Sequence, residues 1–278
     1  MRIANVDGRL AVAVGDSGWV DVEKASSGQF SSDPQAIYDR WDEFVAWTSA
    51  GLSSVDTVTG DLGIPVPAPR QLIAIGLNYR EHAIESNLDI PEHPVVFAKF
   101  QSSLVGPDVT VSLPSDGVDW EVELVIVMGR QAHQVSVDDA WNYVAGLTIG
   151  QDLSWRQVQT RGPAPQFSIG KSYPGFSPLG PVVVTPDEFA DKNDLAISCS
   201  LNGEVLQEGR TSDLIFSVPE LVSRLSQSLT LYPGDVIYTG TPKGVGAGRT
   251  PKRFLVPGTL VSSVEGIGDL TTPLVNGF

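Results

Sequence analysis

Two glutamates in the middle of the chain have the residue type and the spacing of a possible metal-binding site. Glu121 and Glu123 stand at positions i and i+2 of the run 119–128, DWEVELVIVM, which has the composition of a central β-strand. On a strand such side chains share one face and lie about 7 Å apart. Two anions among Trp, Val, Leu and Ile are costly to bury unpaired, and a divalent cation held by carboxylate oxygens removes that cost. The alternative is an edge strand whose glutamates face water.

A third carboxylate, Asp152, comes just after the apolar run 145–149. Arg156 and Gln159 come four and seven residues later, about one and two helical turns, so both can face the same way as Asp152. The alternative role for Asp152 is the N-cap of a helix. The three residues are candidates for the same site as the two glutamates.

His82 and Glu85 form a possible general-base pair. They stand at i and i+3 of the run 78–85, NYREHAIE, and are neighbours if this run is a helix. A carboxylate beside an imidazole orients the ring and raises its basicity. The alternative is an exposed pair on the helix surface. His93 and His133 have no such partner and are expected in loops or on the surface.

Two glycine-rich runs fail as nucleotide motifs. Residues 170–172 imitate the end of a P-loop, but position 165 is proline where that motif needs glycine, and the run 244–249 lacks the third glycine of a dinucleotide fingerprint. The roles that remain are a fixed ammonium at Lys171 and a turn of backbone N–H groups over 239–242, which includes Thr241. Both suit an anionic substrate. Cys199 falls in a predicted strand, where it is expected to be buried and inert.

The elements that must position these residues are mostly strands. Residues 1–24 alternate apolar and polar side chains around turn signals at 7–8 and 15–18, and Asp33 and Pro34 predict a helix over 33–50. The proline-rich run 62–70 predicts a linker. We therefore predict a small N-terminal α+β domain over 1–65 and a main domain over 66–278.

In the main domain the pattern predicts a β-rich α+β fold. The predicted helices cover 79–86, 136–142 and 218–225, and Asn202-Gly203 predicts a tight hairpin. The predicted strands cover 71–77, 95–99, 120–128, 146–151, 181–184, 196–201 and 236–239.

Composition removes several classes of protein. The 278 residues include one cysteine, which excludes an internal disulfide framework and a cysteine-rich zinc site. The formal net charge of -15 argues against nucleic acid as a partner. No apolar run approaches the roughly 20 residues that span a bilayer. The charged N-terminus does not resemble a signal peptide, so we expect a cytoplasmic protein with no membrane partner.

Taken together, these segments resemble the fumarylacetoacetate hydrolase family over roughly residues 70–275. No single motif carries the resemblance, which rests on their order and spacing. The matching segments are GLNY at 76–79 with His82 and Glu85, PVVFAK at 94–99, DWEVEL at 119–124, DLSWR at 152–156, GKS at 170–172, LGP at 179–181, PGDV at 233–236, TGTPKGVG at 239–246 and EGIG at 265–268.

The resemblance implies roles for individual residues. It implies that Glu121, Glu123 and Asp152 bind one Mg²⁺ or Mn²⁺ per subunit and that His82 and Glu85 form a water-activating dyad on a mobile lid. It further implies that Lys171 is a catalytic residue that stabilises developing negative charge, and that the substrate is bound by Arg156, Gln159 and Thr241. Gln151 departs from the asparagine that many relatives have before the metal-binding aspartate.

The resemblance also implies a fold and a reaction. The fold is a mixed β-sandwich roll, and the protein is a homodimer that acts on a small anionic 2-oxo acid. The reaction is hydrolysis of the C–C bond of a 2,4-dioxo acid to pyruvate and a second acid. One alternative uses the same metal and enolate to decarboxylate or tautomerise oxaloacetate or to isomerise a hydroxydienedioate. A more distant alternative is a metal-binding protein without turnover.

Overall fold

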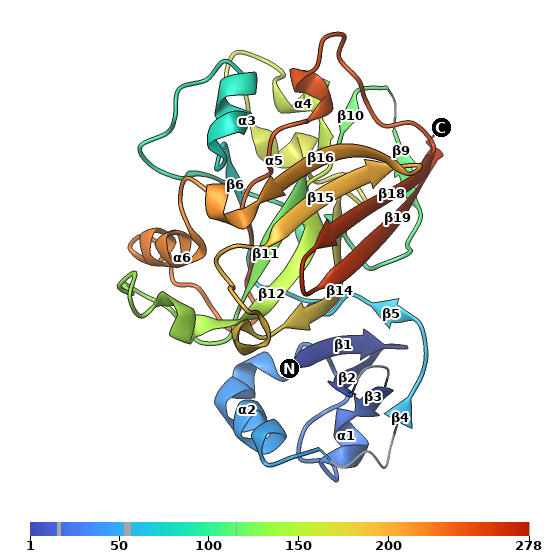
Figure 1. Cartoon of the computed structure of the whole chain (residues 1–278), viewed down its shortest axis with the longest axis vertical. Coiled ribbons are helices and arrows are strands. Elements are labelled where there is room, and N and C mark those ends of the chain that lie inside the picture. Colours follow the sequence, from blue (N-terminus) through green and yellow to red (C-terminus); the bar gives the residue numbers. More distant parts are fainter. Residues whose placement is uncertain (16–17, 53–56, 115, 278) are drawn as a thin grey trace.

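The computed structural model describes residues 1–15, 18–52, 57–114 and 116–277. A long mixed sheet crosses the molecule, and a smaller sheet packs against its middle (Figure 1). In spatial order the long sheet contains β4 (Thr57–Val58), β3 (Gly18–Asp21), β2 (Arg9–Val14), β1 (Arg2–Val6), β14 (Ser177–Val184), β12 (Val144–Gln151), β11 (Val122–Met128), β17 (Val236–Tyr238), β6 (Leu72–Gly76) and β7 (Val95–Ala98), with β5 (Leu62–Gly63) beside β1 and β8 (Leu104–Val105) beside β14.

The smaller sheet and the helices complete the fold. The smaller sheet contains β16 (Glu204–Arg210), β15 (Ala196–Leu201), β18 (Gly258–Val264), β19 (Gly268–Asn276) and β9 (Val111–Leu113), and a short ladder joins β10 (Val118–Asp119) to β13 (Ser154–Trp155). The α-helices are α1 (Val22–Ala25), α2 (Trp41–Ser49), α3 (Arg80–Glu85), α4 (Arg156–Gln159), α5 (Phe167–Gly170) and α6 (Val218–Ser226). The predicted β-rich α+β fold with packed mixed sheets is confirmed.

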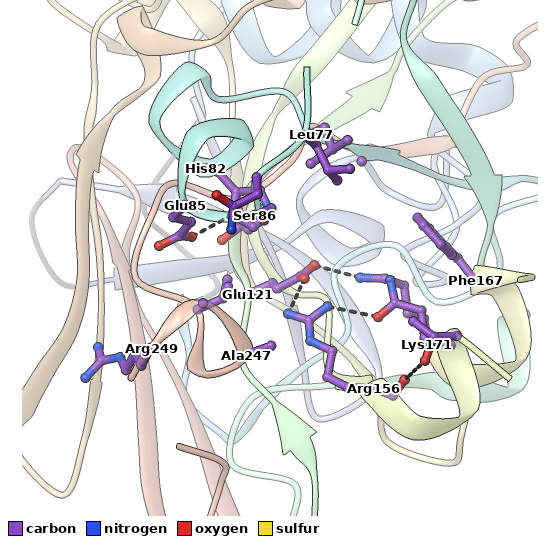
Figure 2. Close-up of a pocket in the computed structure, with 18 of the residues that line it drawn as sticks. Leu77, His82, Glu85, Ser86, Glu121, Arg156, Phe167, Lys171, Ala247 and Arg249 are labelled. Carbon is purple, nitrogen blue, oxygen red and sulfur yellow. Dashed lines mark hydrogen bonds and ion pairs between the residues drawn. The ribbon is translucent and has the colours of Figure 1, made fainter. Parts of the chain in front are cut away.

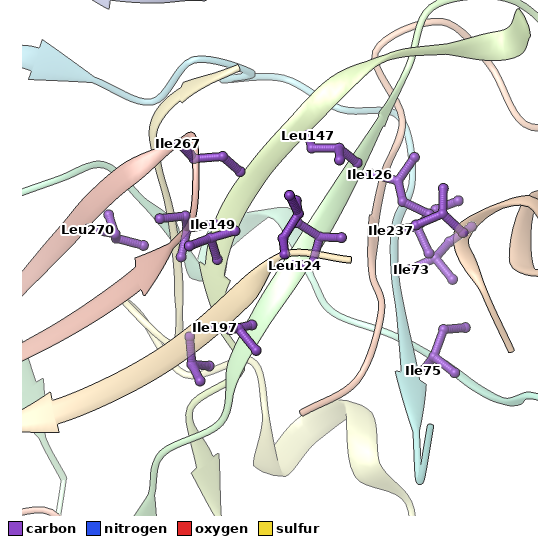
Figure 3. Packing of buried hydrophobic residues seen from close by; sticks show 14 of the residues in the cluster. Ile73, Ile75, Leu124, Ile126, Leu147, Ile149, Ile197, Ile237, Ile267 and Leu270 are labelled. Atoms are coloured by element: carbon purple, nitrogen blue, oxygen red, sulfur yellow. The ribbon is translucent and has the colours of Figure 1, made fainter. Parts of the chain in front are cut away.

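The core explains why β11 and β12 are almost continuously apolar. Leu124 and Ile126 of β11 pack with Ile149 of β12 into the cluster that the smaller sheet covers, to which Ile197 of β15 belongs (Figure 3). The alternate residues of β11, such as Val125, belong to a second cluster shared with the N-terminal segment. A strand buried on both faces needs apolar residues at odd and even positions alike.

The N-terminal strands continue the long sheet. β1 pairs antiparallel with β14 through Arg2↔Val184, so these strands are bonded edge to edge to the main body. The hairpin at 7–8 is confirmed, with φ of 49° at Asp7 and 81° at Gly8. The turn predicted at 15–18 includes residues 16 and 17, which lie outside the described residues. The division at residue 65 stays a prediction.

Two predicted helices are wrong in extent. In place of a helix over 33–50, the chain makes turns, then the 3₁₀ helix Tyr38–Arg40 and then α2. Asp33 does not cap a helix, because its Oδ1 accepts from the Gln35 N–H at 2.9 Å and closes a local turn. In place of a helix over 136–142, the structure has the 3₁₀ helix Ala140–Tyr143. The prediction over 218–225 is confirmed by α6.

The remaining 3₁₀ helices are Gln101–Ser103, Pro186–Glu188, Thr211–Asp213 and Gly246–Gly248. The Asn202-Gly203 hairpin is confirmed, with both residues at positive φ between β15 and β16. Within the described residues, no helix is both long and apolar enough to cross a bilayer. The helices α3, α4 and α5 gather at one end of the molecule, beyond the first residues of β11 (Figure 1).

Candidate active site

Strand register brings the three carboxylates to one face of the long sheet. Glu123 of β11 pairs with Gly150 of β12, and the Asp152 N–H donates to the Glu121 carbonyl at 2.9 Å, so Glu121 lies opposite Asp152. Side chains of directly paired residues point the same way, and so do side chains two positions apart. Glu121, Glu123 and Asp152 therefore converge, with ligand oxygens within 4.8 Å of one another.

Burial decides between the interpretations of these carboxylates. Glu121, Glu123 and Asp152 are 6%, 1% and 0% exposed, so the edge-strand alternative is wrong. Asp152 is not an N-cap, because Trp155 holds that position before α4. A compact, buried set of carboxylate oxygens fits a hard divalent cation such as Mg²⁺ or Mn²⁺.

The strand begins one residue after Glu121, two residues later than predicted. The Glu121 N–H is satisfied by a side chain, since it donates to Gln151 Oε1 at 3.0 Å. The Gln151 amide in turn donates to Ser262 Oγ at 2.9 Å in the smaller sheet. The residue that departs from the common family pattern thus helps to hold the backbone of a predicted metal ligand.

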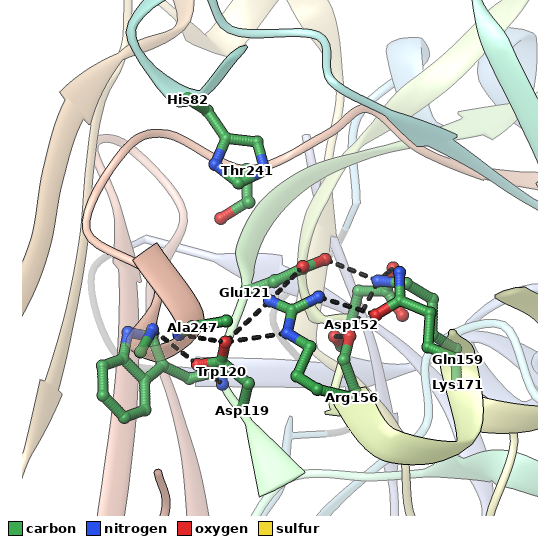
Figure 4. Close-up of polar contacts among 12 residues, drawn as sticks. His82, Asp119, Trp120, Glu121, Asp152, Arg156, Gln159, Lys171, Thr241 and Ala247 are labelled. Atoms are coloured by element: carbon green, nitrogen blue, oxygen red, sulfur yellow. Dashed lines mark hydrogen bonds and ion pairs between the residues drawn. The ribbon is translucent and has the colours of Figure 1, made fainter. Parts of the chain in front are cut away.

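Two buried lysines, Lys99 and Lys171, and the half-buried Arg156 contact the carboxylates, and Figure 4 shows Lys171 and Arg156 beside Glu121 and Asp152. Lys171 Nζ lies 2.6 Å from both Glu121 Oε2 and Asp152 Oδ2. Arg156 Nη2 lies 2.7 Å from Glu121 Oε1. Lys99 Nζ contacts Asp152 Oδ1 and also donates to the Phe176 carbonyl at 3.0 Å.

A fourth carboxylate, Asp119, is 0% exposed and lies 2.8 Å from Arg156 Nη2. The four carboxylates and the three cations Lys99, Lys171 and Arg156 leave one formal negative charge in the cluster. A bound divalent cation would make the cluster net positive by one charge, which favours an anionic ligand.

The charge cluster shifts the pKa values of the two glutamates in opposite directions. Burial raises the pKa of Glu123 well above its ordinary value, and the carboxylates of Asp152 and Glu121 add to the rise. Burial has the same effect on Glu121, but the charges of Lys171 and Arg156 outweigh it and lower the pKa of Glu121. Glu121 is therefore held as an anion by its cations.

The predicted acid–base pair is formed. His82 Nδ1 lies 2.7 Å from Glu85 Oε1, so a neutral ring donates from Nδ1 and keeps its lone pair on Nε2. Glu85 Oε2 also accepts from the Gly244 N–H at 2.9 Å, which ties α3 to the glycine-rich turn. His82 is 8% exposed, so the surface-pair alternative is wrong. Figure 2 shows His82 and Glu85 on α3 facing Glu121 and Arg156.

A cavity of about 530 Å³ separates the acid–base pair from the charge cluster. Its walls include all the predicted site residues except Asp152, whose Oδ2 accepts from Lys171 Nζ. These wall residues are His82, Glu85, Glu121, Glu123, Arg156, Gln159, Lys171 and Thr241. Apolar walls come from Leu77 and from the edge-to-face pair Phe97 and Phe167, whose ring centroids are 5.5 Å apart.

Some predicted substrate contacts already have protein partners. The Thr241 hydroxyl donates to the Val122 carbonyl at 2.9 Å, and Gln159 Oε1 accepts from Arg156 Nη1 at 3.0 Å. The turn over 239–242 was expected to offer backbone N–H groups to a substrate, but the Gly240 N–H donates to Glu123 Oε2 at 2.7 Å. This turn therefore orients a predicted metal ligand.

Sequence reasoning missed Lys99 and Asp119 as members of the site. Lys99 closes a predicted strand and Asp119 stands two residues before Glu121, and neither received a role from its residue type or spacing. The signal for both was present, because each belongs to a segment that carries the family resemblance.

The family comparison decides the identity of this arrangement. A family model described as "Fumarylacetoacetate (FAA) hydrolase C-terminal" matches residues 71–275. The chain belongs to the fumarylacetoacetate hydrolase family. Every predicted site residue of this family member lies inside the matched range.

Three proteins of known name or structure are similar to this chain. Human mitochondrial oxaloacetate tautomerase FAHD2A is 44% identical over 214 residues, which cover 76% of this chain and 68% of that protein. A crystal structure of a candidate HpcE protein from Mycobacterium smegmatis is 52% identical over the whole of both chains, with a TM-score of 0.96. Maleylpyruvate hydrolase from Sphingobium sp. SYK-6, in complex with manganese(II) and pyruvate, is 27% identical over the whole of both chains, with a TM-score of 0.81.

Proposed function

We propose that this chain is a divalent-metal-dependent enzyme that forms the enolate of a small anionic 2-oxo acid, and that it tautomerises oxaloacetate. The observation that carries the proposal is that the hydrogen-bonded pair His82–Glu85 faces a cavity shared with a buried carboxylate cluster. A bound dication would give that cluster a net positive charge. The 44% identity to a human oxaloacetate tautomerase supports this choice of reaction.

In this proposal Glu121, Glu123 and Asp152 hold Mg²⁺ or Mn²⁺. When bound, the cation supplies Lewis acidity that favours the enolate of a 2-oxo acid. His82 Nε2 removes a proton from C3 of oxaloacetate, the electron pair of that C–H bond forms the C2–C3 double bond, and the π pair of the C2 carbonyl moves to its oxygen. The proton held on His82 Nε2 is then returned to this oxygen to give the enol, so no other reactant is consumed.

The other residues of the site stabilise charge. Glu85 accepts from His82 Nδ1 and so stabilises the imidazolium that forms when Nε2 takes a proton. Lys171 and Arg156 hold positive charge beside Glu121, where the negative charge of the substrate and its enolate would lie.

A second candidate is hydrolysis of a 2,4-dioxo acid, and the whole-length similarity to maleylpyruvate hydrolase favours it. Here His82 Nε2 takes a proton from water, and the hydroxide adds to the distal carbonyl carbon. The C3–C4 bond then breaks, its electrons form the enolate of pyruvate, and a proton on C3 completes the products. Thr241 and Lys171 line the cavity in which the hydroxide adduct and the enolate of pyruvate would form.

One panel of substrates separates these candidates. Purified protein with Mn²⁺ or Mg²⁺ is given enol-oxaloacetate, an acylpyruvate and fumarylpyruvate, and the enol absorbance, pyruvate and CO₂ are followed. The proposal expects fast enol–keto exchange of oxaloacetate, reduced about 10²- to 10⁴-fold in His82→Ala. The exposed His133→Ala is the matched control.

Three results would redirect the assignment. Pyruvate and a second acid released from the dioxo acids would favour hydrolysis. Loss of CO₂ from oxaloacetate that survives in His82→Ala would favour decarboxylation, which needs no attacking water. Metal binding without turnover of any 2-oxo acid would favour a binding protein. The homodimer and the cytoplasmic location stay predictions.

A further inference from the structure

We propose that Asp119 is a positioning residue that fixes the His82–Glu85 pair relative to the metal-binding carboxylates. Its carboxylate is 0% exposed and is bonded to both halves of the site (Figure 4). The inference rests on the acid–base role proposed for His82 and Glu85.

The first half of the link is the glycine-rich turn. Asp119 Oδ1 accepts from the Gly246 N–H at 2.7 Å, and Oδ2 accepts from the Ala247 N–H at 2.9 Å. The same turn donates its Gly244 N–H to Glu85 at 2.9 Å. A shift of this turn would therefore move the group that holds Glu85.

The turn is packed so tightly that it transmits such a shift. A Cβ added to Gly246 would lie 1.7 Å from the Arg253 carbonyl oxygen, and one added to Gly244 would lie 2.6 Å from the Leu206 carbonyl oxygen. The residue after Asp119 secures the turn as well, because Trp120 Nε1 donates to the Gly244 carbonyl at 3.1 Å.

The second half of the link is Arg156. Asp119 Oδ2 accepts from Arg156 Nε at 2.8 Å, and Arg156 Nη2 lies 2.7 Å from Glu121 Oε1. Asp119 shares the Arg156 charge with Glu121 and so limits how strongly Arg156 competes with a cation for Glu121. One buried carboxylate thus positions both the turn that anchors α3 and the cation that flanks a predicted metal ligand.

Asp119→Asn tests both halves, because the amide keeps the size of the side chain, removes its charge and offers a single acceptor oxygen. Hydrogen exchange is measured on the metal-free protein, and Mn²⁺ binding is measured by calorimetry. We expect faster exchange in segments 244–248 and 80–88 together and a Mn²⁺ affinity about 10- to 100-fold weaker. The exposed Asp269→Asn is the control and should change neither quantity.

The double variant Asp119→Asn/Arg156→Met separates the two links. Removing both charges should restore most of the Mn²⁺ affinity, while exchange in 80–88 stays fast because the turn still lacks its acceptor. Arg156→Met alone should leave exchange in 80–88 as in the wild type, which keeps the test open if Asp119→Asn does not fold.

Three outcomes would overturn the proposal. They are unchanged exchange over 80–88 in Asp119→Asn, a double variant that binds Mn²⁺ no better than Asp119→Asn, and faster exchange over 80–88 in Arg156→Met. None of these measurements uses a substrate. A failure of the proposed reaction can therefore be distinguished from a failure of this inference. In the first case the wild type shows the expected hydrogen exchange and Mn²⁺ binding but does not turn over oxaloacetate.

Discussion

Replacing Lys99 by methionine tests the electrostatic account of the site. The side chain of Lys99 is 0% exposed and that of Asp152 is 1% exposed, and their contact is one of several that hold Asp152. Lys99 also donates to the carbonyls of Lys171 and Phe176. Methionine fills a similar volume without the charge, so the substitution removes the ion pair and leaves these acceptors without that donor.

The expected loss is large because the remaining partner is buried. Removal of one member of a buried ion pair costs about 3–5 kcal/mol, which corresponds to a Tm lower by roughly 5–9 °C in a chain of this size. A divalent cation beside Asp152 supplies positive charge in its place. Mn²⁺ at a hundred times its Kd stabilises a folded protein by about 2.7 kcal/mol. We expect a larger Mn²⁺-induced rise in Tm for Lys99→Met than for the wild type.

The assay is thermal and urea unfolding of both proteins, with and without Mn²⁺. Lys192→Met is the matched control, because Lys192 stacks on the Trp141 ring at 4.6 Å away from the site, a contact worth about 0.5–1 kcal/mol. The reasoning is refuted if metal-free Lys99→Met loses less than the Lys192 control, or if Mn²⁺ widens the gap between Lys99→Met and the wild type.

Other predictions concern α3 and the N-terminal segment. Glu85→Gln should lower kcat about 10²-fold or more with Mn²⁺ affinity unchanged, because it removes the charge that stabilises the imidazolium; an unchanged kcat would contradict this. Lys243 and Glu81 form an exposed ion pair at 2.7 Å, so removing either charge should lower the free energy of unfolding by less than about 1 kcal/mol. A double variant with the two charges exchanged should recover this loss, and no recovery would mean that the two side chains do not interact. Burial opposes ionisation of Asp21, yet its bond to Arg9 lowers the pKa of Asp21, so its stabilisation is present above its ordinary pKa and fades as pH falls through the lowered value. The Asp21→Asn protein should therefore be less stable than the wild type in urea at pH 7, with a gap that closes in acid; a gap constant with pH would contradict this.

The sequence predicted the centre of the fold better than its margins. The strands over 122–128 and 144–151 are apolar on both faces, and such runs leave few alternatives to a central strand. The helix predicted over 33–50 was too long because the Asp33 side chain bonds to the nearby Gln35 N–H, a local contact that periodicity does not register.

The site was predictable where residues are close in sequence and less so where they meet only in space. Glu121 and Glu123 share a strand face, and His82 and Glu85 share a helix face, so spacing alone brings each pair together. Lys99 and Asp119 join the site through contacts with residues 53 and 37 positions away. Such long-range ion pairs depend on strand order, which composition and periodicity do not contain.

The most direct test of the central claim is a Mn²⁺ titration of the metal-stripped protein and of Glu123→Ala, with turnover of oxaloacetate and of an acylpyruvate measured on the same samples. The account predicts one Mn²⁺ per wild-type chain and loss of both tight binding and turnover in Glu123→Ala. Full turnover by Glu123→Ala, or Mn²⁺ binding as tight as in the wild type, would contradict it.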